Sequence, residues 1–164
     1  MDYVPVVGAL HRLELLRRIR GRGLIGEAGL HMGQPPLLQF IYSHPGCTQR
    51  EAAQELDVTP ASSAASLKRL EKAGLVERRP DYADARRNRL YVTALGKEKL
   101  RECQRRFQAL DERMFAGMSE NEIAAFRSAC EKMFENLADE SCRHLTICKL
   151  ALRAREEEKE EDKA

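Results

Sequence analysis

Residues 48–74 read TQREAAQELDVTPASSAASLKRLEKAG and contain two start signals for helices. Thr48 and Glu51 have the spacing of a capping box, in which the hydroxyl accepts from the amide three residues on and the glutamate reaches back to the cap amide. Thr59 is followed by a proline, and this pair also suits a helix N-terminus. Gly74 suits the left-handed conformation that ends helices. The segment therefore predicts two short helices joined by a tight turn, which is a helix-turn-helix.

A β-hairpin is predicted directly after this motif. Residues 75–79 and 89–93 are suited to strands, and residues 80–88 form a polar turn between them. Between Lys68 and Arg89 there are eight basic and four acidic residues, a net charge of +4, although the whole chain carries only +2. Charge alone would fit an ordinary solvated face. Placed at a hairpin tip beside a helix-turn-helix, it suggests a surface that binds a polyanion.

The flanking segments predict helices. Leu10, Leu13, Leu16 and Ile19 give an amphipathic helix over about residues 9–20, after which we expect glycines 21–33 to break the pattern. A short helix follows over residues 37–41. Two apolar seams with alternating spacings of three and four residues favour packing against another long helix, in this chain or in a partner chain. Their residues are Leu100, Cys103, Phe107, Leu110 and Met114, and Ile123, Phe126, Cys130, Met133 and Leu137.

Several classes of protein are disfavoured by composition. No apolar run approaches the roughly 20 residues needed to cross a bilayer, so we expect no membrane contact and, without a secretory signal, a cytoplasmic protein. The five cysteines form no C-x-x-C pair and are expected to be reduced. Cys142 and His144 would point about 200° apart on a helix, so we expect no metal site. No phosphate loop or nucleophile motif indicates an enzyme, and no cofactor is expected.

Four segments, in this order and spacing, resemble the MarR family of bacterial winged-helix regulators. They are Gln34 to Ile41 leading into His44-Pro45-Gly46, Thr48 to Ala53 with Leu56, Leu67 to Val76, and Asp84-Ala85-Arg86 with Leu90 to Thr93. The resemblance implies a homodimer with interlocking N- and C-terminal helices and one lobe per protomer for double-stranded DNA. Two-fold symmetry then favours a pseudo-palindromic operator.

The resulting fold class is mainly α with a small two- or three-stranded β-wing: a winged helix-turn-helix plus a helical dimerisation region. We assign residues 1–30 to an N-terminal helix that is part of the dimerisation region and residues 31–96 to the DNA-binding lobe. Residues 97–152 supply the C-terminal dimerisation helices. Residues 153–164 form a charged tail that is expected to be disordered.

The candidate DNA contacts lie on the second helix of the motif, on its first helix and on the wing. If Ser63, Leu67 and Leu70 face inward, the opposite flank can enter the major groove, with its basic residues reaching phosphates. Arg86 is the strongest candidate for the minor groove, and Asp84 is expected to position the wing arginines. The full set of contacts is Thr48, Gln49, Ser62, Ala65, Ser66, Lys68, Arg69, Arg86, Arg87, Asn88 and Arg89.

Regulators of this kind usually release DNA when a small aromatic or anionic molecule binds between the dimer helices and the lobe, or when a cysteine is oxidised. The sequence does not specify the trigger or the ligand residues. Cys47, Cys142 and Cys148 are the better redox candidates, because Cys103 and Cys130 lie on the apolar seams. The alternative function is a protein-interaction module of the same fold without sequence-specific DNA binding.

Overall fold

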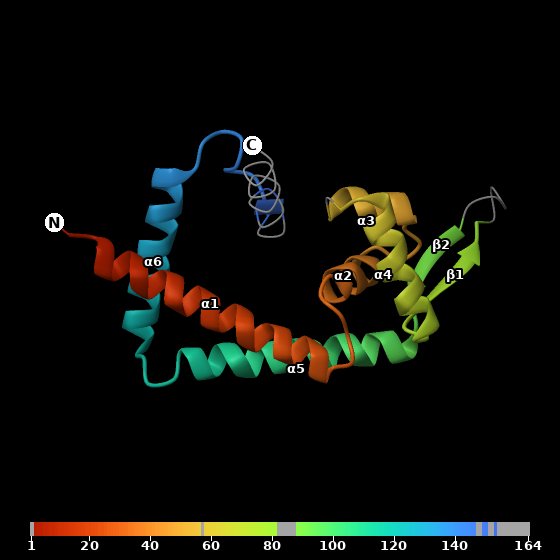
Figure 1. The fold of residues 1–164 in the computed structure, drawn as a ribbon, viewed down its shortest axis with the longest axis horizontal. Helices are drawn as coiled ribbons and strands as arrows, with labels where there is room; N and C mark the ends of the chain where they lie inside the picture. The colour runs from red at the N-terminus through yellow and green to blue at the C-terminus, as the bar shows by residue number, and fades with distance from the viewer. Residues whose placement is uncertain (1, 57, 82–87, 147–148, 151–152, 154–164) are drawn as a thin grey trace.

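The computed structural model describes residues 2–56, 58–81, 88–146, 149–150 and 153, and in this part the chain forms six helices and two strands (Figure 1). The elements are α1 Val4–Glu27, α2 Gln34–Ser43, α3 Gln49–Glu55, α4 Pro60–Lys72, β1 Val76–Pro80, β2 Asn88–Val92, α5 Ala94–Met114 and α6 Glu120–Leu137. A lobe of α2, α3, α4 and the hairpin sits at one end of a long arm made of α1, α5 and α6. The mainly α winged helix-turn-helix predicted from the sequence is confirmed.

The residues predicted to begin and end α3 and α4 do so in the structure. Glu51 N donates to Thr48 Oγ1 at 3.2 Å, and Thr48 N donates to the Glu51 carboxylate at 2.6 Å, which completes the capping box of α3. The Thr59 hydroxyl accepts from Ser62 N at the start of α4. Gly74 has a φ of 69°, which closes α4 as predicted. These local hydrogen bonds set where α3 and α4 begin and end.

The core of the lobe lies between α2, α4 and β2. Its largest fully buried side chains are Leu37, Leu38, Ile41, Leu67, Leu70 and Leu90. Ala52, on α3, is also fully buried, because its small side chain lets α3 approach α4 closely. This packing fixes which side of α4 faces inward.

The wing is a two-stranded antiparallel sheet with a register from Val76 opposite Val92 to Pro80 opposite Asn88. A single bridge joins Cys47 to Leu90, where Leu90 N donates to the Cys47 carbonyl at 2.9 Å. The bridge ties the loop before α3 to the wing. The hairpin therefore cannot move independently of the helix-turn-helix.

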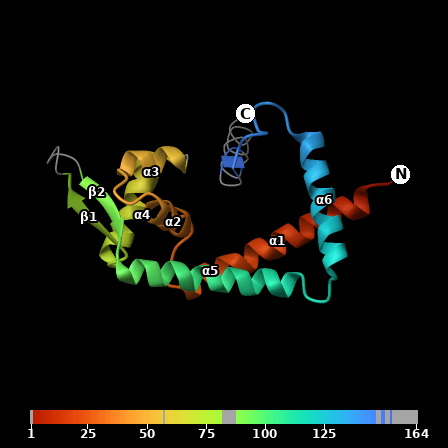
Figure 2. The same cartoon turned by 180° about the vertical axis from the view of Figure 1, so that it is seen from behind.

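The first helix of the arm is longer than expected from the sequence. Glycines 21, 23 and 26 were expected to break the first helix, but α1 continues to Glu27. A Cβ at Gly21 would lie 3.1 Å from Phe107 Cε1, so the glycine allows α1 to approach α5. This contact offsets the roughly 1 kcal/mol by which glycine weakens a helix. Figure 2 shows α1 lying along α5 from the opposite side, and Arg17 pairs with Asp111 across the two helices at 3.0 Å.

The last helix, α6, rises from the far end of α5 (Figure 1). It begins at a second capping box, formed by Ser119 and Glu122. None of its residues is buried within the described part of the protomer. Among the described residues, its apolar seam is only partly covered: Ile123, Phe126 and Cys130 are half-buried, and Met133 and Leu137 are exposed.

Gly96 provides a test of the junction between lobe and arm. A Cβ there would overlap the Leu75 carbonyl oxygen and lie 2.7 Å from Val92 Cγ1. We expect Gly96→Ala to lower the free energy of unfolding by about 1–3 kcal/mol through overpacking. Gly23→Ala is the matched control, since nothing lies within 4 Å of its added methyl, and it should raise stability by about 0.5–1 kcal/mol. Urea unfolding followed by circular dichroism measures both, and equal effects would contradict this packing.

Candidate nucleic-acid interface

The outer flank of α4 presents the residue types predicted for a major groove. Ser62, Ala65, Lys68 and Arg69 are exposed, and Ser66 is half-buried. The opposite side of the helix is buried through Ser63, Leu67 and Leu70. The predicted inner and outer faces of this helix are therefore confirmed. Within the described residues, Lys68 and Arg69 have no ion-pair partner, so both charges are available to an external anion.

The start of α3 is more constrained than its sequence indicated. The amide of Thr48, a candidate DNA contact, donates to Glu51 within the capping box. The Gln49 side chain accepts from Arg78 Nη2 at 3.1 Å, and Arg78 also pairs with Glu71. The Thr48 and Gln49 side chains are therefore held in place by the protein itself. Their contact with DNA stays a prediction.

Arg89 has protein partners that sequence reasoning missed. Its Nε donates to Asp81 at 2.7 Å, and its Nη1 donates to the Gly46 carbonyl at 3.1 Å. The hydrogen bond and charge of Asp81 raise the pKa of Arg89 above its usual value, so the guanidinium stays charged. Arg89 thus braces the wing against the loop before α3. We expected a phosphate or groove contact with DNA here. Sequence spacing alone does not distinguish an arginine that braces the wing from one that binds DNA.

Only part of the wing tip can be compared with expectation. Asp84, Arg86 and Arg87 lie outside the described residues. Asn88 is exposed at the first position of β2, opposite Pro80.

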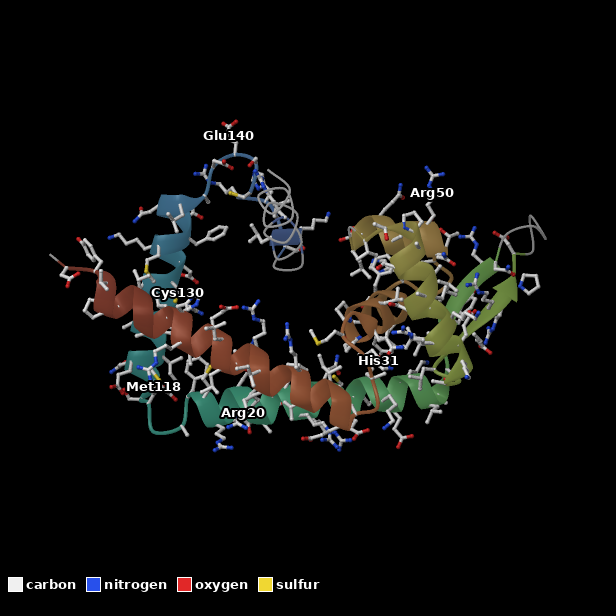
Figure 3. All side chains as sticks on the ribbon, in the orientation of Figure 1. Arg20, His31, Arg50, Met118, Cys130 and Glu140 are labelled. Atoms are coloured by element: carbon white, nitrogen blue, oxygen red, sulfur yellow. The ribbon has the colours of Figure 1, made fainter. Side chains whose placement is uncertain are left out.

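Two further residues on α3 belong to this surface and were missed from sequence. Arg50 and Gln54 are exposed one turn apart, and both line a shallow hollow of about 600 Å³ that reaches Val58 and Pro60 at the turn before α4. Figure 3 shows Arg50 projecting away from the lobe. Arg50 has no ion-pair partner among the described residues. The available signal was its position next to the capping box, on the side of α3 opposite the buried Ala52.

The basic residues of the lobe therefore fall into two groups. Arg78 pairs with Glu71, and Arg79 pairs with Glu77 and lies 4.5 Å from the centre of the Tyr91 ring. These contacts support a structural role on the wing. Arg50, Lys68, Arg69 and Lys72 carry charges left unpaired within the described residues.

Neither a metal site nor a membrane-spanning helix is found among the described residues. No group of three or more His, Cys, Asp and Glu side chains in that part of the chain is arranged to hold a metal ion. Likewise, none of the helices described there combines the length and apolar character needed to span a bilayer.

Comparison with known proteins places this geometry in a family. A model described as "MarR family" matches residues 28–87, which contain α2, the helix-turn-helix and the first half of the wing. The chain is 25% identical over 132 residues to the HTH-type transcriptional repressor Rv2887 of Mycobacterium tuberculosis, covering 80% of this chain and 95% of that protein.

Two solved structures resemble the whole fold. The crystal structure of MarR is 28% identical, with a TM-score of 0.62 over 96% of this chain and 98% of that one. Streptococcus pneumoniae FabT in complex with DNA is 25% identical, with a TM-score of 0.65 over 83% of this chain and 97% of that one. The family model, the curated relatives and the fold agree: the chain belongs to the MarR family, a family of DNA-binding transcription regulators and not of enzymes.

Proposed function

We propose that this regulator is a homodimeric repressor that binds a pseudo-palindromic DNA operator and releases it when a small molecule binds. The observation that carries the proposal is the outer flank of α4, where exposed small residues lie beside the unpaired charges of Lys68 and Arg69. The name of the relative Rv2887 supports repression, and the FabT complex supports DNA as the ligand.

In this proposal α4 enters the major groove. Ser62, Ala65 and Ser66 lie near its start, where small side chains can approach base edges and thymine methyl groups. Lys68 and Arg69 lie further along the helix and reach phosphates, and Arg50 on α3 adds a phosphate contact. Thr48 and Gln49 position the start of α3 near the backbone. These contacts fix the register of the helix on the duplex.

The wing supplies the second part of the interface. Arg86 enters the minor groove, while Arg87 and Asn88 contact the backbone and Asp84 positions the arginines. Arg89, held by Asp81 and Gly46, keeps the hairpin at a fixed angle to α3. The wing is then a rigid extension of the helix-turn-helix, which favours simultaneous contact with two grooves.

Dimerisation is proposed from the apolar residues that the protomer leaves exposed on its arm. On α1 these include Val4, Val7 and Ile19, each more than half exposed, and on α6 Leu137 is 87% exposed. Large apolar side chains in such numbers usually mark an interface. In this proposal the first and last helices form the dimerisation region. It comprises residues 1–30 and 97–152, and the lobe comprises residues 31–96.

The protein is also proposed to act in the cytoplasm, because a regulator of transcription acts on the chromosome.

A small anion is favoured as the trigger. A groove of about 270 Å³ between α1 and α5 has apolar walls that include Leu16 and Leu110, and three arginines line it. Arg17 is paired with Asp111, whereas Arg20 and Arg113 have no ion-pair partner in the described part of the chain. Apolar walls with unpaired guanidinium groups suit an amphipathic anion.

Oxidation is less well supported. Cys47 was a redox candidate because of its loop position, but it is buried beside Leu90, and burial raises the pKa of its thiol to about 11. Burial also raises the pKa of Cys103. A reactive cysteine needs an accessible thiolate, so neither meets the requirement. Cys142 is half-buried and stays a candidate, while Cys148 lies outside the described residues.

Selection from random duplex DNA at moderate salt should enrich a pseudo-palindrome. In anisotropy titrations on that site, Arg86→Ala and Arg50→Ala should each weaken binding by about 1–3 kcal/mol, roughly fivefold to a hundredfold. Arg127→Ala is the control, because Arg127 lies on α6 beside Glu131. Unchanged affinity for Arg86→Ala would remove the wing from the interface. If no sequence is enriched, the alternative of a protein-interaction module replaces the operator.

Sedimentation equilibrium should give a mass twice the 18.7 kDa of one chain. Met133→Glu places a charge on the exposed seam of α6, so it should weaken the dimer without unfolding the protomer, because Met133 is 38% exposed. Leu95→Glu, at an exposed leucine on the lobe side of α5, is the control and should leave the mass unchanged. A wild-type monomer at micromolar concentration would rule out the dimer.

Alkylation of the native protein by iodoacetamide at pH 8 should spare Cys47. With a pKa of about 11, only about one Cys47 thiol in a thousand is ionised at that pH, and raising the pH toward 11 increases the thiolate fraction. Peptide mass spectrometry should show Cys142 modified at least roughly ten times faster than Cys47. Equal rates in the folded protein would return Cys47 to the redox candidates.

A further inference from the structure

The chain reverses direction after α6 ends at Leu137, and the described residues that follow lie on the side of α6 nearer the lobe (Figure 1). The Asp139 carboxylate forms the turn: it accepts from the Ser141 hydroxyl at 2.6 Å and from Cys142 N at 3.1 Å. These hydrogen bonds lower the pKa of Asp139 to about 2, so the carboxylate stays ionised at neutral pH. Arg153, further along, donates from Nη1 to the Ser141 hydroxyl at 2.6 Å. The chain beyond the turn is therefore held next to it.

Lys149 shows how close this returning segment comes to the lobe. Its Nζ lies 3.9 Å from a carboxylate oxygen of Glu55 on α3. Both side chains are partly exposed, so the pair itself adds little stability. Its importance is positional, because it brings the C-terminal part of the chain beside the helix-turn-helix. The residues that follow Arg153 therefore begin near α3.

The end of the sequence carries a concentrated negative charge. Residues 156–164 contain six acidic residues and two lysines, a net charge of −4. Residues 154–164 lie outside the described part of the chain. Eleven residues can span up to about 36–40 Å, whereas α4, with 13 residues, is about 20 Å long. From a start near α3, the acidic residues are therefore able to reach the exposed faces of both α3 and α4.

These two faces present the opposite charge. The acidic side chains described on α3 and α4 are Glu51, Glu55 and Glu71, and each has a partner within the protein. Asp57, between the helices, lies outside the described residues. The exposed cations that have no ion-pair partner among the described residues are Arg50, Lys68, Arg69 and Lys72. A run of glutamates and a phosphate backbone both offer such cations closely spaced negative charges.

We propose that the acidic residues 156–164 bind the exposed faces of α3 and α4 in the same chain and compete there with DNA. The competition rests on the proposed function, whereas the contact itself does not. A segment attached to the protein meets this surface at an effective concentration of the order of millimolar, so weak ion pairs are enough for partial occupancy. The segment must leave before a duplex binds, and it therefore lowers the affinity for DNA.

Carbodiimide crosslinking of the full chain without DNA tests the contact. The reagent joins a carboxylate to a lysine amine, with loss of water, when the two groups touch. At about 50 mM salt, where screening is weak, peptide mass spectrometry should show residues 156–161 joined to Lys68 or Lys72. Lys132, an exposed lysine on α6, is the control, and an equal yield there would overturn the contact. In a subunit-exchanged mixture of ¹⁴N- and ¹⁵N-labelled protein, joined peptides should carry one label. Mixed pairs at the statistical frequency would assign the contact to a second copy and overturn the proposal.

Removal of negative charge from this segment should strengthen DNA binding. The test variant carries three substitutions in the full chain, Glu156→Gln, Glu157→Gln and Glu158→Gln. Its affinity for the selected operator should rise about threefold to tenfold at about 50 mM salt, because the attached competitor is weakened. The matched control removes three exposed carboxylates from α6 and the turn after it, through Glu120→Gln, Glu131→Gln and Glu140→Gln (Figure 3). It alters the net charge equally and should change the affinity by less than about twofold. Equal gains in both variants would indicate general repulsion of DNA and overturn the proposal.

Salt dependence gives a second measurement of the competition. Salt weakens the binding of the acidic segment as well as that of DNA, so the wild-type protein should lose operator affinity less steeply with salt than the test variant. The two affinities should converge at high salt. A constant ratio between them at all salt concentrations would contradict a competitor held by ion pairs. If the wild-type protein binds no duplex at all, the proposed function fails, and the crosslinking still decides whether the segment contacts α4.

Discussion

The burial of one side of α4 is the constraint on which the remaining surface depends. Leu67 and Leu70 are fully enclosed by the lobe core, so the helix cannot rotate without exposing two leucines, each worth about 1.5–3 kcal/mol when buried. With that side fixed, Ser62, Lys68 and Arg69 can only face outward. Specific recognition requires such a fixed side, because a rotation would exchange the residues offered to the groove for apolar ones. The side chains that α4 can offer to a groove are thus set by the core behind it.

Local signals in the sequence were sufficient for the lobe and insufficient for the arm. Capping residues and Gly74 act over three or four positions, so the limits of α3 and α4 could be predicted closely. The low helix propensity of Gly21 suggested that the helix ends there. In the structure Gly21 instead lets α1 pack closely against Phe107, which is 86 residues away in the sequence. Cys47 shows the same limit of local signals. Its loop position suggested an accessible thiol, but the residue is bridged to Leu90 and buried.

The distribution of charge shows a related limit. Counting residues gave a net charge of +4 between Lys68 and Arg89, which pointed correctly to a basic lobe. The structure divides those charges by their partners: Arg78, Arg79 and Arg89 are held by carboxylates, while Lys68 and Arg69 are unpaired within the described residues. Paired arginines stiffen the wing, whereas the unpaired cations remain available to an external anion. Basic residues of both kinds add equally to the net charge, so only their partners in the structure distinguish the two roles.

In the proposed dimer, the arm would turn these local constraints into a means of regulation. α5 has 21 residues, about 31 Å of continuous helix, and it carries the lobe at one end and the exposed α6 seam at the other. Because Gly96 is packed against Leu75 and Val92, a tilt of α5 must move the wing with it. In a dimer joined through α1 and α6, such a tilt changes the spacing of the two α4 helices. The proposed ligand of the groove between α1 and α5 would act on that tilt. It would therefore alter the half-site spacing of both protomers and leave the fit of each α4 helix to its own half-site unchanged.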